Sequence, residues 1–170
     1  LVAPSDITFE QLHLALTTIR GHHGALRMRL VSGAENDHAL ARFTIDSSES
    51  LPEIDLQLLD VCALSDELAE QTIQQAFATM SEKLNPSEPG KMMTALWVQR
   101  PLPAQNLLLW VIHHFAVDGV SWRVLIEDLS ILTSTEKASL PDHTMPLRVW
   151  AEHLHNQGIN KERQVEEALW

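Results

Sequence analysis

The stretch Asn106–Trp122 reads NLLLWVIHHFAVDGVSW. An unbroken apolar run leads to two histidines, and an aspartate and a glycine follow ahead of a helical pattern. The run Leu107–Ile112 is too short for a typical helix and has no polar alternation. It therefore predicts a strand buried on both faces near the middle of a sheet. Ionisable side chains at the end of such a strand predict an active site there.

The two histidines are expected to point in opposite directions. Side chains alternate across a strand, so His113 shares a face with Val111 and His114 shares a face with Ile112. Only one imidazole can then serve the site, and the other packs against the protein.

Composition limits the classes of protein that this chain can belong to. Its 170 residues, of which 45% are hydrophobic, predict a single domain over 1–170 with a substantial core. A formal net charge of −11 argues against a nucleic-acid partner and disfavours an anionic membrane surface.

Cellular location follows from weaker signals. Cys62 is the only cysteine, which excludes an internal disulfide and favours a reducing, cytoplasmic environment. No run of about 18 apolar residues predicts a membrane span, and the N-terminus does not resemble a signal peptide. Because the first residue is Leu1 and not methionine, we expect a piece of a larger protein.

The spacing of apolar residues, together with turn and capping residues between the apolar segments, predicts alternating strands and helices. The expected strands are Ala25–Val31, Leu40–Ile45, Ile54–Val61, Met92–Gln99 and Leu107–His113, with a hairpin turn at Gly33–Asp37. The expected helices begin at Ser5 or Asp6, at Ser65 and at Val120, a short one opens at Pro146, and a last one covers Asn160–Trp170. The fold class is α/β or α+β, a two-layer sandwich with a mixed, largely antiparallel sheet covered by helices.

The block His113–Gly119 matches the HHxxxDG signature of the condensation and epimerization domains of nonribosomal peptide synthetases. His22–Leu30 (HHGALRMRL) resembles that family's RHExLRTxF stretch, although His22 and Gly24 depart from it, and Gly90–Val98 resembles its next strand. Val117–Leu129 (VDGVSWRVLIEDL) is more similar to the epimerization branch. The resemblance implies the N-terminal lobe of a chloramphenicol acetyltransferase-like fold, without the C-terminal lobe.

The resemblance also implies roles for the motif residues. The resemblance assigns the catalytic role to His114, the second histidine of the motif. A histidine suits this role because it can hold or release a proton near neutral pH. His113 is structural, and Asp118 pairs with Arg27 to fix the loop that aims His114. Trp122 belongs to the core or to a tunnel wall.

Plainer readings of these residues stay open. Asp118 lies just before a helix and could simply cap it, and Gly119 could be a turn former that needs a positive φ or a close backbone approach. A metal site at His113, His114 and Asp118 is disfavoured, because adjacent strand residues diverge and no supporting Cys or HExxH spacing is present.

Three functions follow as expectations. The first is epimerization of an aminoacyl or peptidyl thioester, with no directly bound cofactor and with the substrate held on the phosphopantetheine arm of a carrier protein. The second is condensation or another acyl transfer, and the third is a non-catalytic lobe that docks a carrier protein. The expected partners are the peptidyl carrier protein, the missing C-terminal lobe and neighbouring synthetase domains.

Overall fold

The computed structural model describes residues 1–3, 7–31, 42–134, 138–142 and 145–159. The chain divides into two compact units, Leu1–Leu140 and Pro141–Trp170. The first unit contains every strand that the described residues form, and the second contains helix α4 (Leu147–Gly158). The single domain predicted over 1–170 stays a prediction.

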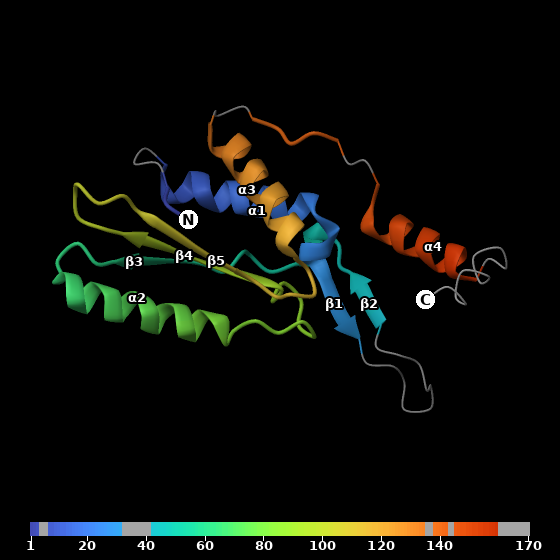
Figure 1. The fold of residues 1–170 in the computed structure, drawn as a ribbon, viewed down its shortest axis with the longest axis horizontal. Helices are drawn as coiled ribbons and strands as arrows, with labels where there is room; N and C mark the ends of the chain where they lie inside the picture. The colour runs from blue at the N-terminus through green and yellow to red at the C-terminus, as the bar shows by residue number, and fades with distance from the viewer. Residues whose placement is uncertain (4–6, 32–41, 135–137, 143–144, 160–170) are drawn as a thin grey trace, which may run out of the picture. The chain divides into compact units, whose positions relative to one another are not determined.

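The larger sheet of the first unit has three strands in the order β3-β4-β5. They are β3 (Leu56–Asp60), β4 (Met93–Gln99) and β5 (Leu107–Ile112). β3 and β4 are parallel, whereas β4 and β5 pair antiparallel. The prediction of a mixed sheet is confirmed, and Figure 1 shows the three strands side by side.

Helices cover both faces of this sheet, so the unit has three layers where the sequence predicted two (Figure 1). Helices α1 (Phe9–His22) and α3 (Gly119–Ser134) lie on one face, and α2 (Asp66–Ser81) lies on the other. Two separate apolar cores result. The larger core, on the side of α1 and α3, includes Leu12, Leu16, Ile19, Trp97, Trp110, Leu125 and Leu129. The smaller core, beneath α2, is formed by Val61, Met80, Leu96 and Val98.

The central strand is β4 and not β5, which corrects the prediction for Leu107–Ile112. Six of the seven residues of β4 are buried, whereas β5 alternates between half-buried and buried residues. β5 is the last strand of the sheet that the structure describes, and only Val2 forms a bridge on its outer side, opposite Leu107. The bounds of β5 match the prediction, but an apolar run alone does not tell an edge strand from a central one.

A second, two-stranded sheet pairs β1 (Met28–Val31) with β2 (Arg42–Ile45) antiparallel. The strand predicted over Ala25–Val31 is shorter than expected, because Gly24–Arg27 forms a 3-10 helix. The predicted turn at Gly33–Asp37 lies outside the described residues. β1 also contacts the loop after α2, where the Leu30 N–H donates to the Pro86 carbonyl at 2.7 Å.

Hydrogen-bonding side chains mark the starts of the long helices. Thr8 caps α1 in a capping box with Gln11, one turn or less from the predicted caps, which lie outside the described residues. Ser65 caps α2, as predicted. Two large apolar residues of α2 do not pack, since Leu68 and Phe77 are 49% and 45% exposed. Its packing residues are Ala69, Ile73, Ala76 and Met80.

Buried Arg20 ties α1 to the loop that precedes β3. Its Nη2 donates to the Pro52 carbonyl at 2.8 Å, and burial lowers the pKa of the guanidinium. Gly90 has a φ of 73°, and a Cβ there would come within 2.9 Å of the Pro52 ring. Glycine is therefore required at position 90 both by conformation and by space.

In the second unit, α4 begins directly after Pro146, as predicted. The helix predicted over Asn160–Trp170 lies outside the described residues. None of the helices described is both long and apolar enough to cross a bilayer.

Candidate functional site

The two histidines lie at the turn that connects β5 to α3. The His113 N–H donates to the Met92 carbonyl at 2.8 Å, and the His113 carbonyl accepts from the Ala116 N–H at 2.9 Å. The backbone of the turn is therefore fixed at its first residue by the segment that leads into β4. The candidate site lies at the end of the strand, as predicted, but β5 ends at Ile112, so both histidines lie in the turn and strand alternation does not set their directions.

The environments of the two imidazoles differ. The His113 ring is half-buried, and its Nδ1 accepts a hydrogen bond from the Phe115 N–H at 3.2 Å. The His114 side chain is exposed, and no hydrogen bond joins it to any part of the chain that the structure describes. An exposed, unengaged imidazole is free to approach a substrate, whereas the other imidazole is already engaged. The catalytic role of His114 and the structural role of His113 stay predictions.

Asp118 is the N-cap of α3. Its Oδ1 accepts hydrogen bonds from the Val120 N–H at 3.1 Å, from the Ser121 N–H at 2.7 Å and from the Ser121 hydroxyl at 2.6 Å. The hydrogen bonds from Ser121 hold the pKa of the Asp118 carboxyl below its ordinary value. The carboxylate is therefore ionised at neutral pH and is not available there as a proton donor.

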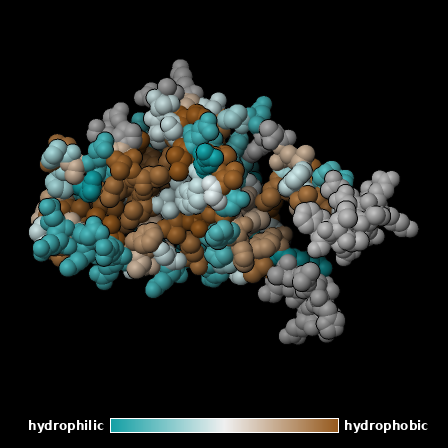
Figure 2. Space-filling view, in the orientation of Figure 1, coloured by the Kyte–Doolittle hydropathy of each residue, from teal (hydrophilic) through white to brown (hydrophobic). Residues whose placement is uncertain are grey.

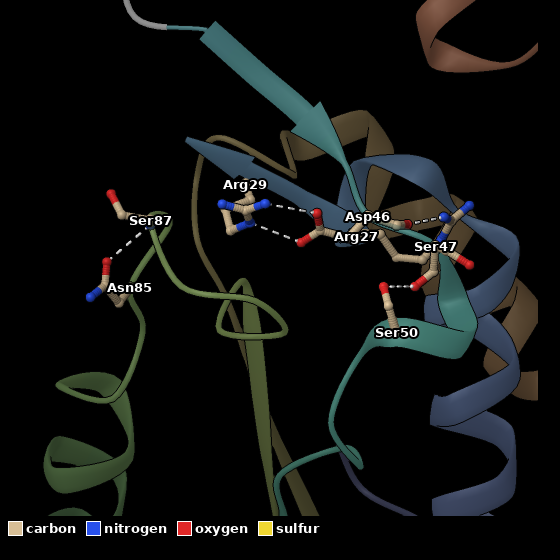
Figure 3. Close-up of polar contacts among 7 residues, drawn as sticks. All are labelled: Arg27, Arg29, Asp46, Ser47, Ser50, Asn85 and Ser87. Atoms are coloured by element: carbon tan, nitrogen blue, oxygen red, sulfur yellow. Dashed lines mark hydrogen bonds and ion pairs between the residues drawn. The ribbon is translucent and has the colours of Figure 1, made fainter. Parts of the chain in front are cut away.

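The predicted pair of Asp118 with Arg27 does not form between these two described side chains. Arg27 lies in the 3-10 helix before β1, and its Nη1 donates to the Asp46 carbonyl. Arg29 binds the Asp46 carboxylate through Nε and Nη2 at 3.1 and 3.2 Å (Figure 3). Both arginines thus converge on the residue that follows β2. The capping contact explains Asp118 without an ion pair, and that prediction is wrong.

Gly119 satisfies neither structural condition that the sequence suggested. Its φ is not positive, and a Cβ built on it would meet no described atom within 4 Å. The space beside the first residue of α3 is open. Nothing within the described residues therefore requires glycine at this position.

Trp122 packs in the core, in agreement with its predicted place. Its ring meets Trp110 of β5 edge-to-face, with ring centroids 5.6 Å apart and an interplanar angle of 89°. The contact joins the first turn of α3 to the sheet face beneath it. Trp122 therefore fixes the far side of the turn that carries the histidines.

A polar pair that the sequence reasoning missed joins the end of α1 to α3. Asp128 is only 6% exposed, and its Oδ2 contacts Nε2 of His23. A signal was present in the sequence, because Asp128 lies three residues after Leu125 and directly before Leu129, two apolar residues that share one face of a helix. His23 also matches the histidine of the family's RHExLRTxF stretch. The pair holds the segment that leads to Arg27 against the helix that follows the motif.

A small hollow lies beside the motif turn. It has a volume of about 220 Å³ and lies between the 3-10 helix and the first turns of α3. Its lining includes His23, Leu26, Ala116, Ser121 and Leu125. Figure 2 shows apolar residues over much of the visible face, and Phe43, Phe115, Val120 and Val124 are among the exposed large apolar side chains.

Metal chemistry finds no support in the arrangement of the described residues. Within the ranges that the structure covers, no three His, Cys, Asp or Glu side chains gather closely enough to hold a metal ion. Asp118 is turned into the cap of α3, where it binds backbone and hydroxyl donors. The expected absence of a metal site stays a prediction.

Comparison with known proteins assigns the chain to a family. The family model described as "Condensation domain" matches residues 1–170, so the chain belongs to the condensation domain family. One protein of the linear gramicidin synthase of Brevibacillus parabrevis is 31% identical over 165 residues, covering 95% of this chain and 3% of that protein. One protein of the plipastatin synthase of Bacillus subtilis (strain 168) is 32% identical, covering 94% of this chain and 6% of that protein.

Solved structures agree with this assignment. The epimerization domain from the third module of tyrocidine synthetase B is 25% identical, with a TM-score of 0.83, and the match covers 99% of this chain and 37% of that one. The starter condensation domain of rhizomide synthetase is 19% identical with a TM-score of 0.77 over 99% of this chain and 41% of that one, and it shows the shared fold. The fold is thus a lobe of the chloramphenicol acetyltransferase-like fold. The chain spans less than a tenth of the curated relatives named above and under half of each of these structures.

The cap at Asp118 makes a first prediction. Asp118→Ala is expected to lower the Tm by a few degrees, as for the loss of an N-cap, and the effect of Arg27→Ala should add to it independently. The Asp118 pKa is lowered in the folded state, so the cap stabilises the protein above the unfolded pKa of about 3.9 and this contribution is lost as the pH falls further. Thermal melts of both variants and the double variant at neutral and acid pH check this. If the effects of the two substitutions on stability were strongly coupled, they would support the ion pair between Asp118 and Arg27 that the sequence predicted.

The buried pair makes a second prediction. Asp128→Ala removes the carboxylate that satisfies His23 and is expected to cost about 1.5–3 kcal/mol of unfolding free energy. Glu127→Ala, next to it on the exposed side of α3, is the matched control and should change little. Urea unfolding followed by circular dichroism measures both. Equal, small effects would mean that the His23–Asp128 contact does not stabilise the fold.

Proposed function

We propose that this chain is the first lobe of an epimerization domain of a nonribosomal peptide synthetase. Its reaction inverts the α-carbon of an aminoacyl or peptidyl thioester. The observation that carries the proposal is the motif turn, where His114 is exposed while His113 and Asp118 are engaged by neighbouring donors. One imidazole is thus left for chemistry at the surface of the lobe.

Two observations favour epimerization within the family. The sequence after the motif, SWRVLIEDL, is similar to that of the epimerization branch. Among the structural matches described above, the epimerization domain of tyrocidine synthetase B has the higher TM-score, 0.83 against 0.77. Both observations are likenesses, and the reaction itself is the subject of the experiment below.

The proposed chemistry is a proton transfer at the α-carbon. The thioester carbonyl acidifies the α-proton, and Nε2 or Nδ1 of neutral His114 removes it as a general base. A group on the opposite side of the carbon then returns a proton to the other face, which inverts the configuration. His113 and Asp118 take no proton in this scheme, because they position the turn and begin α3.

The proposal implies partners that lie outside this chain. The substrate is carried on the phosphopantetheine arm of a peptidyl carrier protein, and no directly bound cofactor is required. The opposing acid or base belongs to a C-terminal lobe, and neighbouring synthetase domains supply and accept the thioester. The enzyme acts in the cytoplasm on a carrier-bound substrate, without a nucleic-acid or membrane partner.

Condensation is the second candidate, because the matched family model carries that description and a condensation domain shares the fold. In that reaction His114 would assist an amine in attacking the thioester carbonyl. The two reactions differ in what they need: epimerization uses one loaded carrier, whereas condensation uses two.

An assay of the complete domain with its cognate loaded carrier distinguishes epimerization from condensation. With one L-aminoacyl or peptidyl carrier and no acceptor, we expect chiral analysis of the released acid to give a mixture of L and D forms. Strict dependence on a second loaded carrier, with peptide bond formation and no D product, would assign condensation instead. A domain that binds the carrier but catalyses neither epimerization nor condensation would support the third function, a non-catalytic lobe that docks a carrier protein.

A further inference from the structure

The motif turn is anchored at both ends but not in its middle, since Ala116 and Val117 are buried and Asp118 caps α3. His113 is fixed through the Met92 carbonyl, but the next two residues, His114 and Phe115, are both exposed. An exposed turn whose second residue performs proton transfer needs a further constraint, because misplacement of a reacting group by about 1 Å can cost about 10²-fold in rate. The structure contains such a constraint in a chain of three rings.

The three rings run from the turn to the smaller sheet. The Phe115 ring lies 4.6 Å from the His113 ring between centroids, at an interplanar angle of 53°. The Phe115 ring also meets Phe43 edge-to-face, at 5.3 Å and 79°. Phe43 belongs to β2, 72 residues before Phe115 in the sequence, and β2 pairs with β1 and with no strand of the sheet that contains β5.

Burial does not explain why these rings meet. Phe115 is 53% exposed and Phe43 is 44% exposed, so neither ring is required by the core. An edge-to-face contact contributes a free energy beyond its buried area that corresponds to roughly a 2- to 10-fold preference for the held arrangement. That is too small to determine folding, but it is enough to bias the position of a surface turn.

We propose that Phe43 is a positioning residue for the motif turn: through Phe115 and His113 it holds the orientation from which His114 reaches the substrate. The inference rests on the proposed role of His114. It gives one residue of the two-stranded sheet, Phe43, a role at the site, although β1 and β2 contribute no residue of the HHxxxDG motif.

The test compares four substitutions in the complete domain: Phe43→Ala, Phe43→Tyr, Phe115→Ala and the double Phe43→Ala/Phe115→Ala. Phe43→Ala is expected to lower kcat by roughly 3- to 10-fold, with KM within about 2-fold, because the substrate is bound elsewhere while the base is misaligned. Phe43→Tyr keeps the ring and should retain the wild-type kcat. In the Phe115→Ala background, Phe43→Ala should have no further effect, because the contact is already lost.

Ile45→Ala is the matched control. Ile45 lies two residues from Phe43 on the same face of β2 and is 36% exposed, and its side chain lies beside Gly24 of the 3-10 helix, where a Cβ would meet Ile45 Cδ1 at 3.7 Å. Its kcat should equal the wild-type value. If Phe43→Ala fails to fold, Phe43→Leu decides by the same criteria, because it keeps an apolar side chain on the strand but lacks the ring.

The outcomes separate this inference from the proposed function. An unchanged kcat for Phe43→Ala, or losses that multiply in the double variant, would overturn the positioning role while His114→Ala remains inactive. A fully active His114→Ala variant would overturn the proposed function and, with it, the inference. A kcat loss in Ile45→Ala equal to that of Phe43→Ala would also overturn the inference, because the effect would then belong to the strand as a whole.

Discussion

His114→Ala in the complete domain is expected to lower the rate of α-proton exchange by about 10²–10⁴-fold, the usual contribution of a general acid or base. Folding should be unaffected, because the side chain is exposed and hydrogen-bonded to no described residue. Loss of the α-deuterium from a labelled carrier-bound thioester measures the rate, and circular dichroism measures the fold.

His153→Ala is the control for the loss of an imidazole as such. His153 is also exposed and lies on α4, where it stacks on Trp150. Its exchange rate should match that of the wild type. Near-normal exchange in a folded His114→Ala variant would end the catalytic assignment of the motif.

The second large effect is expected when this chain is separated from the opposing lobe. Inversion of the α-carbon needs a base on one side of the carbon and an acid on the other. Holding both groups in place corresponds to effective molarities on the order of 10⁵ M or more. This chain provides one exposed imidazole at the motif turn, so by itself it should give no turnover above background. It should still fold, because both apolar cores are formed within residues 1–140.

Separation from the opposing lobe should also leave apolar side chains exposed to solvent. Phe43, Phe115, Val120 and Val124 are each 44% exposed or more, which favours self-association when no lobe faces them. Light scattering measures the mass of the 170-residue protein. Turnover equal to that of the complete domain, from a monomer, would contradict the division of the site between two lobes.

Local signals in the sequence predicted the elements around the site well. The apolar run gave the bounds of β5, the serine at position 65 marked the start of α2, and Pro146 marked the start of α4. These features depend on neighbours in sequence: side-chain alternation, capping and the fixed φ of proline. The position of the motif histidines directly after a strand followed from the same information.

Long-range contacts were the features that sequence patterns could not determine. The parallel pairing of β3 with β4 joins residues 39 positions apart in the sequence, and no local pattern encodes strand order. The resemblance assigned Arg27 to Asp118, whereas Arg27 binds the carbonyl of Asp46. The contact between Phe43 and Phe115 likewise depends on how two sheets meet. Of these long-range contacts, only the one between Asp128 and His23 could have been anticipated from the sequence, because Asp128 is an acidic residue on an apolar helix face.

The most direct test of the central claim is to incubate the complete domain in D₂O with a single carrier loaded with an L-aminoacyl or peptidyl thioester. The account predicts that deuterium enters the α-position in both the L and D products without an acceptor amine, and that His114→Ala abolishes this incorporation while Ile45→Ala does not. An α-carbon that stays protonated and fully L after many carrier equivalents, from a domain that forms a peptide bond once a second loaded carrier is added, would contradict it.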